Sequence, residues 1–304
     1  MGVLIQARKL TKRYNGLLAV NHIDFDVAKG ECVGFLGPNG AGKTTTVRMI
    51  YCFLPVTEGE LSVGGMDVMS HAREIKNIVG VAPQEDNLDP DFAVLKNLKV
   101  YARYFGISGS DAEKKAIDLL KFFQLEEKKN ALIDQLSTGM KRRLIIARAL
   151  INDPRILLLD EPTTGLDPQA RHIVWDEIRN LKKRGVTIIL TTHYMDEATA
   201  LCDRVLIMDN GKIIEKGTPM ELIRKHIGED VLEMDYSEDA VALLKRELPS
   251  ARTEVFGDRI HVFIDQPHGV FERFANMFSG RNITIRSANL EDVFLKLTGR
   301  KLRE

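Results

Sequence analysis

One short loop limits the possible folds of this chain more than any other feature. Residues 37–44 have the sequence Gly-Pro-Asn-Gly-Ala-Gly-Lys-Thr, between an apolar run at 33–36 and a helical pattern from Thr45 onward. This is the pattern G-x-x-x-x-G-K-[ST], in which backbone N–H groups curl round a phosphate and the helix N-terminus adds partial positive charge. A glycine-rich turn before an ordinary helix is the structural alternative. The strand–loop–helix context favours a phosphate site in an α/β fold.

Within this loop, individual residues have distinct expected roles. Lys43 would bring a point charge to the outer phosphates, and Thr44 would place a hydroxyl on Mg²⁺. The residues expected to hold the nucleotide phosphates are Gly37, Pro38, Asn39, Gly40, Ala41, Gly42, Lys43, Thr44 and Thr45.

A second segment supplies carboxylates. Residues 156–161 read Ile-Leu-Leu-Leu-Asp-Glu, an apolar strand that ends in two acidic residues. Asp160 at a strand end is suited to hold Mg²⁺, and Glu161 is placed to orient or deprotonate a water molecule. An acidic turn before Pro162 is the structural alternative. Beside a phosphate-binding loop, the pair predicts nucleotide hydrolysis.

The remaining pattern of the first 220 residues alternates short apolar runs with helical periodicity, which predicts an α/β domain with a largely parallel sheet. The expected buried strands are 31–36, 78–82, 156–159, 186–190 and 204–208. The expected helices are 44–54, 93–105, 112–123, 141–151, 168–183 and 195–202. Residues 3–8 and 20–27 alternate apolar and polar positions, as in an antiparallel sheet with one wet face.

Domain boundaries follow from changes in this pattern. Strand signals vanish between Gln84 and Leu136, so a helical subdomain is expected at about 85–150 within a domain of residues 1–228. Behind a boundary near Gly228, residues 229–304 are expected to form a small α+β domain. Its helices are expected at 238–247, 268–278 and 289–298 and its strands at 231–236, 252–256, 259–264 and 282–286, an order similar to the split βαβ arrangement.

Composition excludes several classes of protein. Lys plus Arg number 43 and Asp plus Glu number 43, so a net charge of zero gives no bulk argument for nucleic-acid binding. The three cysteines show no disulfide or zinc spacing, which favours a reducing compartment. We find no signal peptide and no apolar run long enough to span a membrane, so a cytoplasmic location is expected.

The segment that decides among nucleotide-binding families is residues 136–140, Leu-Ser-Thr-Gly-Met. It resembles the signature of ABC transporter ATP-binding subunits, Leu-Ser-Gly-Gly-Gln, with Thr138 and Met140 as departures. Ser137 and Gly139, the pair that contacts the γ-phosphate in that family, are both present. A serine N-cap opening an ordinary helix is the alternative.

The resemblance assigns further residues. It implies that Tyr14 stacks on adenine, that Gln84 contacts Mg²⁺ and water, and that His193 contacts the γ-phosphate. It also implies that Asp167 lies at the interface of two subunits. Glu161, His193 and Gln84 are therefore the expected catalytic residues, and Thr44, Gln84 and Asp160 are the expected metal ligands.

The resemblance also implies partners. A homodimer would hold two ATP molecules at its interface, and a separate transmembrane permease would recruit it to the cytoplasmic face of the membrane. Residues 81–88, 137–143 and 289–299 look like the ABC-2 export group, which includes daunorubicin-resistance and nodulation-factor exporters. The alternatives are a soluble ABC ATPase that clamps DNA or the ribosome, and a catalytically inactive regulatory homologue.

Two local patterns remain open between structural and functional interpretations. The basic trio Lys141, Arg142 and Arg143 is expected to be a solvated helix face, with an anion nearby as the alternative. Tyr101, Tyr104 and Phe105 share one helix face. Core packing is the favoured interpretation of these aromatic residues, and a docking surface for a membrane partner is the alternative.

Overall fold

The fold is described from a computed structural model, which defines residues 2–247, 252–264 and 282–299. These residues belong to two compact units, which divide between Lys216 and Gly217. The sequence placed the boundary near Gly228, one helix later. Helix α8 (Pro219–His226) belongs to the second unit because it packs against α11 (Leu290–Thr298), whose Lys296 ammonium donates to the carbonyl of His226.

A six-stranded sheet forms the centre of the first unit, in the order β10-β9-β3-β8-β7-β6. Its strands are β3 (Cys32–Leu36), β6 (Val79–Ala82), β7 (Ile156–Asp160), β8 (Thr187–Thr192), β9 (Arg204–Asp209) and β10 (Lys212–Gly217). Every residue of β3, β7 and β8 is buried. These strands are rich in apolar residues because both faces of the sheet are covered by other elements of the unit.

The helices that accompany this sheet are α1 (Lys43–Ile50), α2 (Ala72–Ile78), α6 (Pro168–Lys183) and α7 (Met195–Leu201). Helix α1 packs on β7 and β8, and α7 packs on β3 and β8. The helix expected at 44–54 ends at Ile50, since Cys52 adopts a left-handed φ of 57°. Helix α2 and strand β10 were not predicted, because each contains only two large apolar residues and is otherwise polar.

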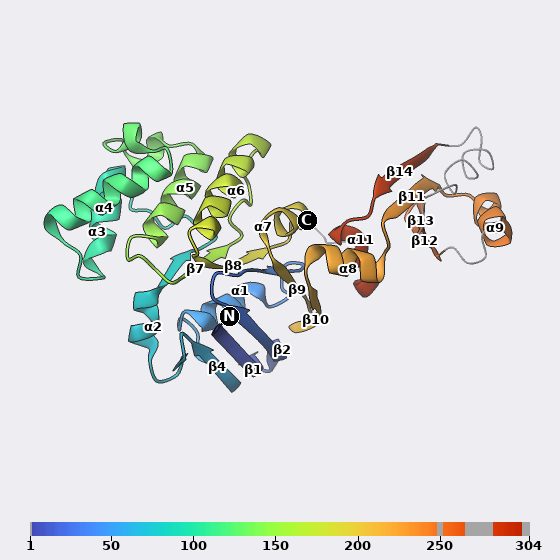
Figure 1. The fold of residues 1–304 in the computed structure, drawn as a ribbon, viewed down its shortest axis with the longest axis horizontal. Coiled ribbons are helices and arrows are strands. Elements are labelled where there is room, and N and C mark those ends of the chain that lie inside the picture. The colour runs from blue at the N-terminus through green and yellow to red at the C-terminus, as the bar shows by residue number, and fades with distance from the viewer. Residues whose placement is uncertain (1, 248–251, 265–281, 300–304) are drawn as a thin grey trace. The chain divides into compact units, whose positions relative to one another are not determined.

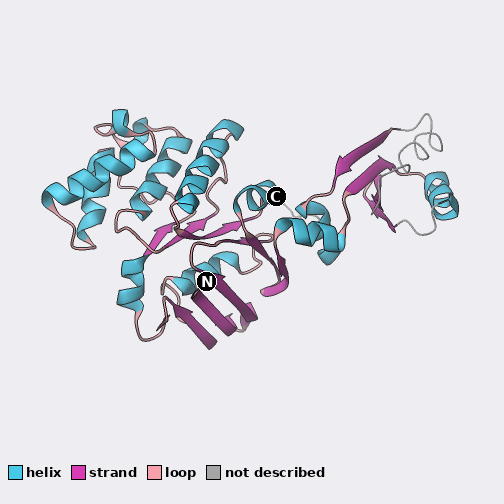
Figure 2. Cartoon of the chain, viewed as in Figure 1, coloured by secondary structure: helices cyan, strands magenta, loops and turns pink. Residues whose placement is uncertain are grey.

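An antiparallel sheet of order β2-β1-β4-β5 lies beside the six-stranded sheet in Figures 1 and 2. Its strands are β1 (Val3–Tyr14), β2 (Leu17–Ala28), β4 (Glu58–Val63) and β5 (Met66–Asp67). The alternation seen in the sequence correctly predicted β1 and β2, although both are longer than expected. Strand β4 was missed, since glycine and glutamate dominate its first half.

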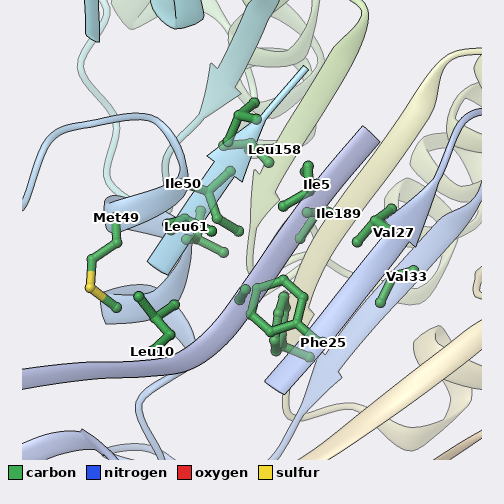
Figure 3. Packing of buried hydrophobic residues seen from close by; sticks show 14 of the residues in the cluster. Ile5, Leu10, Phe25, Val27, Val33, Met49, Ile50, Leu61, Leu158 and Ile189 are labelled. Carbon is green, nitrogen blue, oxygen red and sulfur yellow. The ribbon is translucent and has the colours of Figure 1, made fainter. Parts of the chain in front are cut away.

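One hydrophobic core joins the two sheets. Ile5, Leu10, Phe25 and Val27 from β1 and β2 face Leu158 and Ile189 of the central sheet in Figure 3, and all have exposed fractions of 1% or less. Met49 and Ile50 of α1 complete the contact. This packing fixes α1, and therefore the loop before it, against the sheet.

The helical insertion is present as expected. It contains α3 (Val94–Arg103), α4 (Gly109–Phe122), α5 (Thr138–Ala149) and the short 3-10 helices η1 (Glu126–Lys128) and η2 (Ile133–Gln135). Helices α3, α4 and α5 pack on one another, and α5 also packs on β6. Helix α5 therefore connects the insertion to the central sheet.

The second unit contains an antiparallel sheet of order β12-β13-β11-β14. Its strands are β11 (Asp230–Asp235), β12 (Arg252–Phe256), β13 (Arg259–Ile264) and β14 (Ile283–Ser287), and one helix, α9 (Glu238–Glu247), follows β11. The predicted strands agree closely, and the predicted helix at 268–278 lies outside the described residues. Leu290, Val293 and Phe294 of α11 are fully buried.

Candidate functional site

The polar residues predicted from the sequence meet at one edge of the central sheet. Strands β7, β8 and β3 are parallel neighbours, so their carboxyl ends lie together. The glycine-rich loop follows β3, Asp160 ends β7 and Thr192 ends β8. Ligands of open parallel sheets bind outside these carboxyl ends.

The lysine of the loop is buried within it. Lys43 is 4% exposed, and its ammonium group donates to the carbonyls of Gly37 (2.7 Å) and Pro38 (3.1 Å). Burial lowers the pKa of Lys43, an effect that the charge of Glu161 opposes. Gly42, at the helix N-terminus, has a φ of 101° that favours glycine, and a Cβ there would lie 2.5 Å from the carbonyl of Ala19. The loop thus holds a desolvated cation that an anion would stabilise.

Asp160 accepts two hydroxyl hydrogen bonds at the same carboxylate oxygen. Thr44 donates from α1 at 3.0 Å, and Thr191 donates from β8. A carboxylate and a hydroxyl side by side are oxygen ligands of the kind that Mg²⁺ prefers. The arrangement fits the metal role predicted for Thr44 and Asp160.

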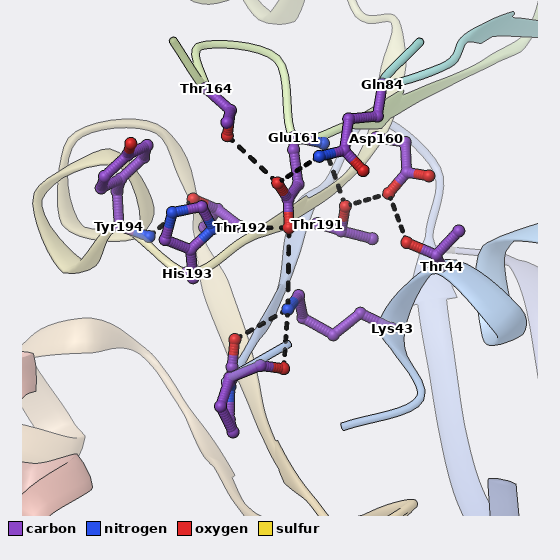
Figure 4. A network of polar contacts seen from close by, with 12 residues as sticks. Lys43, Thr44, Gln84, Asp160, Glu161, Thr164, Thr191, Thr192, His193 and Tyr194 are labelled. Carbon is purple, nitrogen blue, oxygen red and sulfur yellow. Dashed lines mark hydrogen bonds and ion pairs between the residues drawn. The ribbon is translucent and has the colours of Figure 1, made fainter. Parts of the chain in front are cut away.

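Glu161 is the convergence point of the site (Figure 4). Its carboxylate lies 3.9 Å from the Lys43 ammonium and 3.4 Å from Nδ1 of His193. It accepts hydrogen bonds from the side chains of Gln84 (3.0 Å) and Thr164 (3.1 Å). Interaction with His193, followed by the charge of Lys43, lowers the pKa of the Glu161 carboxyl, so it is ionised at neutral pH.

The backbone of Glu161 has an unusual conformation. Its φ is 47°, a left-handed value that costs a non-glycine residue about 1 kcal/mol or more. The amide of Glu161 donates to both the carbonyl and the hydroxyl of Thr191, each at 3.1 Å. These contacts hold the carboxylate toward the loop rather than along the strand.

Four other predicted residues lie elsewhere. Ser137 caps α5 by accepting from the Met140 amide (3.3 Å), and Asp167 caps α6 by accepting from Ala170 (2.9 Å). Gly139 faces the same end of α6, since a Cβ on it would lie 2.9 Å from that of Ala170. Tyr14 is 38% exposed at the end of β1, with the Lys12 ammonium 5.1 Å from its ring centroid. Within the described residues, no contact joins these four to Lys43, Asp160 or Glu161.

The structure shows that the interpretation of Arg142 as a solvated residue is wrong. It also agrees only in part with each interpretation of the aromatic residues at 101–105. Arg142 is 7% exposed rather than solvated, and its guanidinium donates to three backbone carbonyls. The aromatic residues at the end of α3 are neither wholly core nor wholly surface, because Tyr104, just past the helix, is 79% exposed while Tyr101 and Phe105 are half-buried. Arg148 lies over the ring of Tyr101, 4.8 Å from its centroid.

Sequence reasoning missed two hydroxyl groups that organise the site, those of Thr191 and Thr164. Thr191 belongs to the run Thr-Thr-His that ends β8, and its proximity to His193 was the available signal. Thr164 lies two residues after Pro162 in the turn that follows Glu161, where nothing in the sequence marks it out.

Comparison with known proteins decides the family. The model of the ABC transporter family matches residues 20–164, and the C-terminal domain model of the nodulation factor export protein matches residues 236–299. A "Nod factor export ATP-binding protein I" of Burkholderia pseudomallei is 48% identical over 98% of both chains. The protein of the same name from Cupriavidus metallidurans is 44% identical over 100% of both chains. The chain belongs to the ABC transporter family, as an ATP-binding subunit.

Solved structures agree with this assignment to the ABC transporter family. A dimeric ATP-binding cassette in a post-hydrolysis state, bound to ADP and Pi, is 28% identical, with a TM-score of 0.65 over 71% of this chain and 98% of that one. A subunit of a Clostridium perfringens ABC transporter complex is 25% identical, with a TM-score of 0.67 over 82% of this chain and 97% of that one.

The resemblance read from the sequence and the expected α/β ABC ATPase fold are thus confirmed, and the chain is an ATPase of the ABC class. The named relatives are export proteins, which gives no support to a DNA-repair or ribosomal clamp. In the described part of this ABC subunit, no helix is long and apolar enough to cross a bilayer.

Proposed function

We propose that this chain hydrolyses ATP to drive export through a separate membrane permease, in the manner of its relatives. The observation that carries the proposal is the position of Glu161, whose ionised carboxylate lies beside both Lys43 and His193. A general base must be deprotonated and held close to the phosphates. The left-handed backbone and the contacts of Thr191 hold Glu161 in that position.

The bound nucleotide supplies a phosphoryl group whose transfer spreads negative charge over its oxygens. Lys43 and the backbone N–H groups of the glycine-rich loop would stabilise that charge, and Thr44, Asp160 and Gln84 are the residues that would hold Mg²⁺. Glu161 accepts a proton from the attacking water. His193, whose Nδ1 lies 3.4 Å from the Glu161 carboxylate, orients the outer phosphate.

The positions of Ser137, Gly139 and Asp167 support a homodimer. These residues gather at the beginnings of α5 and α6. A twofold arrangement would place them on the ATP of the facing subunit, because an isologous interface presents the same surface from both copies. The solved cassette described above is a dimer. Tyr14 is proposed to stack on adenine, which its exposed ring permits.

The permease is proposed to be a separate polypeptide that holds the subunit on the cytoplasmic face of the membrane. A tagged Glu161→Gln variant, loaded with ATP and Mg²⁺, would be mixed with detergent-solubilised membranes and its partners identified by mass spectrometry. Lys43→Ala serves as the matched control with the nucleotide site impaired. Nucleotide-dependent recovery of a polytopic membrane protein supports the proposal, and recovery of soluble or ribosomal partners alone contradicts it.

A further inference from the structure

Arg142 is a buried cation with a defined set of partners. Its Nε donates to the carbonyl of Pro162 and its Nη2 to the carbonyl of Asp160, both at 2.8 Å, while Nη1 donates to the carbonyl of Pro83. Burial lowers the pKa of this guanidinium to about 10, so it remains charged at neutral pH. A planar guanidinium presents donors in a fixed fork, which a lysine cannot reproduce.

The three carbonyls belong to the segments that carry the residues proposed for hydrolysis. Pro83 immediately precedes Gln84, while Asp160 and Pro162 flank Glu161 on either side. One side chain of α5 therefore holds the backbone on both sides of Glu161, where φ is left-handed. It also holds the start of the loop whose Gln84 donates to the Glu161 carboxylate.

A second arginine of α5 holds the other end of the same loop. Arg148 is 6% exposed, and its Nη1 donates to the carbonyl of Asn87 at 2.9 Å while its Nη2 donates to the side-chain oxygen of Asn87. Arg142 and Arg148 therefore fix residues 83–87 at both ends to one helix. The same helix begins at the Ser137 cap.

We propose that Arg142 is a positioning residue, which with Arg148 ties the Gln84 loop and the backbone of Glu161 to helix α5. A displacement of α5 then moves the Gln84 loop and the backbone of Glu161 with it. The two arginines thus connect the segment around Ser137 to the hydrolytic carboxylate within one subunit. This inference rests on the roles proposed above for Gln84 and Glu161.

The test compares Arg142→Lys with Arg143→Lys in the full chain. Arg143 is the adjacent residue of α5, but its Nη1 donates to the carbonyl of Phe123 (2.8 Å) in the helical insertion. Both variants keep the charge and lose a guanidinium. For each variant we would measure kcat and KM for ATP hydrolysis, the ATP dissociation constant, and backbone hydrogen exchange without nucleotide.

For Arg142→Lys we expect kcat to fall by about 10- to 100-fold, as for a small misplacement of reacting groups, with ATP affinity within about twofold of wild type. Amide exchange should rise in residues 84–88 and 161–164 and stay unchanged in α5. Arg143→Lys should keep its kcat within about twofold. Equal kcat in the two variants, or exchange that rises along all of α5, would overturn the proposal.

A second variant covers the case in which Arg142→Lys does not fold. Arg148→Lys should raise exchange in residues 86–88 while residues 161–164 remain protected, and unchanged exchange in 86–88 contradicts the two-ended attachment. Because exchange is measured without nucleotide, it does not depend on whether Glu161 is the base. Normal hydrolysis by Glu161→Gln would instead overturn the proposed function and leave the positioning result standing.

Discussion

The hydroxyl of Thr191 donates a hydrogen bond to the carboxylate of Asp160, joining the ends of two neighbouring strands. The same hydroxyl accepts the amide of Glu161 at 3.1 Å. Thr191 therefore orients both the proposed metal ligand and the proposed base. This connection depends on a hydroxyl and would be lost in an isosteric valine.

Thr191→Val should reduce the rate of ATP hydrolysis and weaken the Mg²⁺ binding proposed for Asp160. Losing a hydrogen bond to a charged group costs about 1.5–3 kcal/mol, so kcat should fall by about tenfold or more and the Mg²⁺ concentration for half-maximal rate should rise. Steady-state hydrolysis at several Mg²⁺ concentrations measures both effects. Thr187→Val, at the buried opposite end of β8, is the control. Equal rates in the two variants would contradict the role assigned to Thr191.

Lys43→Ala should weaken nucleotide binding itself. The ammonium is buried and desolvated. A hydrogen bond from it to a phosphate contributes about 1.5–3 kcal/mol, so its loss should raise the ATP dissociation constant by about 10- to 100-fold. Binding of a fluorescent ATP analogue measures this change. Lys183→Ala, on an exposed position near the end of α6, should bind the analogue normally. An unchanged affinity in Lys43→Ala would argue against a phosphate site in this loop.

Much of this site could be predicted because its residues follow strands. Residues 156–161 and Gly37 through Thr44 have types and neighbours that specify both a local structure and a chemistry. The contacts of Arg142 were not predictable, because local periodicity cannot tell which face of a basic helix turn meets backbone carbonyls of distant segments. Strand β10 and helix α2 were missed for a related reason, since their stability comes from tertiary packing rather than from their own pattern.

Glu177 on α6 should make the stability of the protein depend on pH. It is 3% exposed, neither carboxylate oxygen has a hydrogen-bond partner among the residues that the structure describes, and burial raises its pKa to about 8. Between its ordinary pKa of 4.5 and about 8, the folded state keeps a proton that the unfolded state releases. Stability is therefore lost as pH rises through this window.

Glu177→Gln removes this titration. The variant should be more stable than wild type at pH 8, with an advantage that shrinks by up to about 1.4 kcal/mol for each pH unit as the pH falls toward 5. Urea denaturation at pH 5, 6, 7 and 8 measures the difference. Glu127→Gln, at an exposed position of η1, is the control. A stability difference that does not vary with pH would show that Glu177 does not titrate in this range.

The central claim is that Glu161 acts as the base for hydrolysis of ATP held by the loop of Lys43. The most direct test is to measure ATP turnover and ATP retention together for wild type and Glu161→Gln. We predict that turnover of the variant falls by about 10²- to 10⁴-fold while ATP stays bound. A variant that hydrolyses ATP at the wild-type rate would contradict the account.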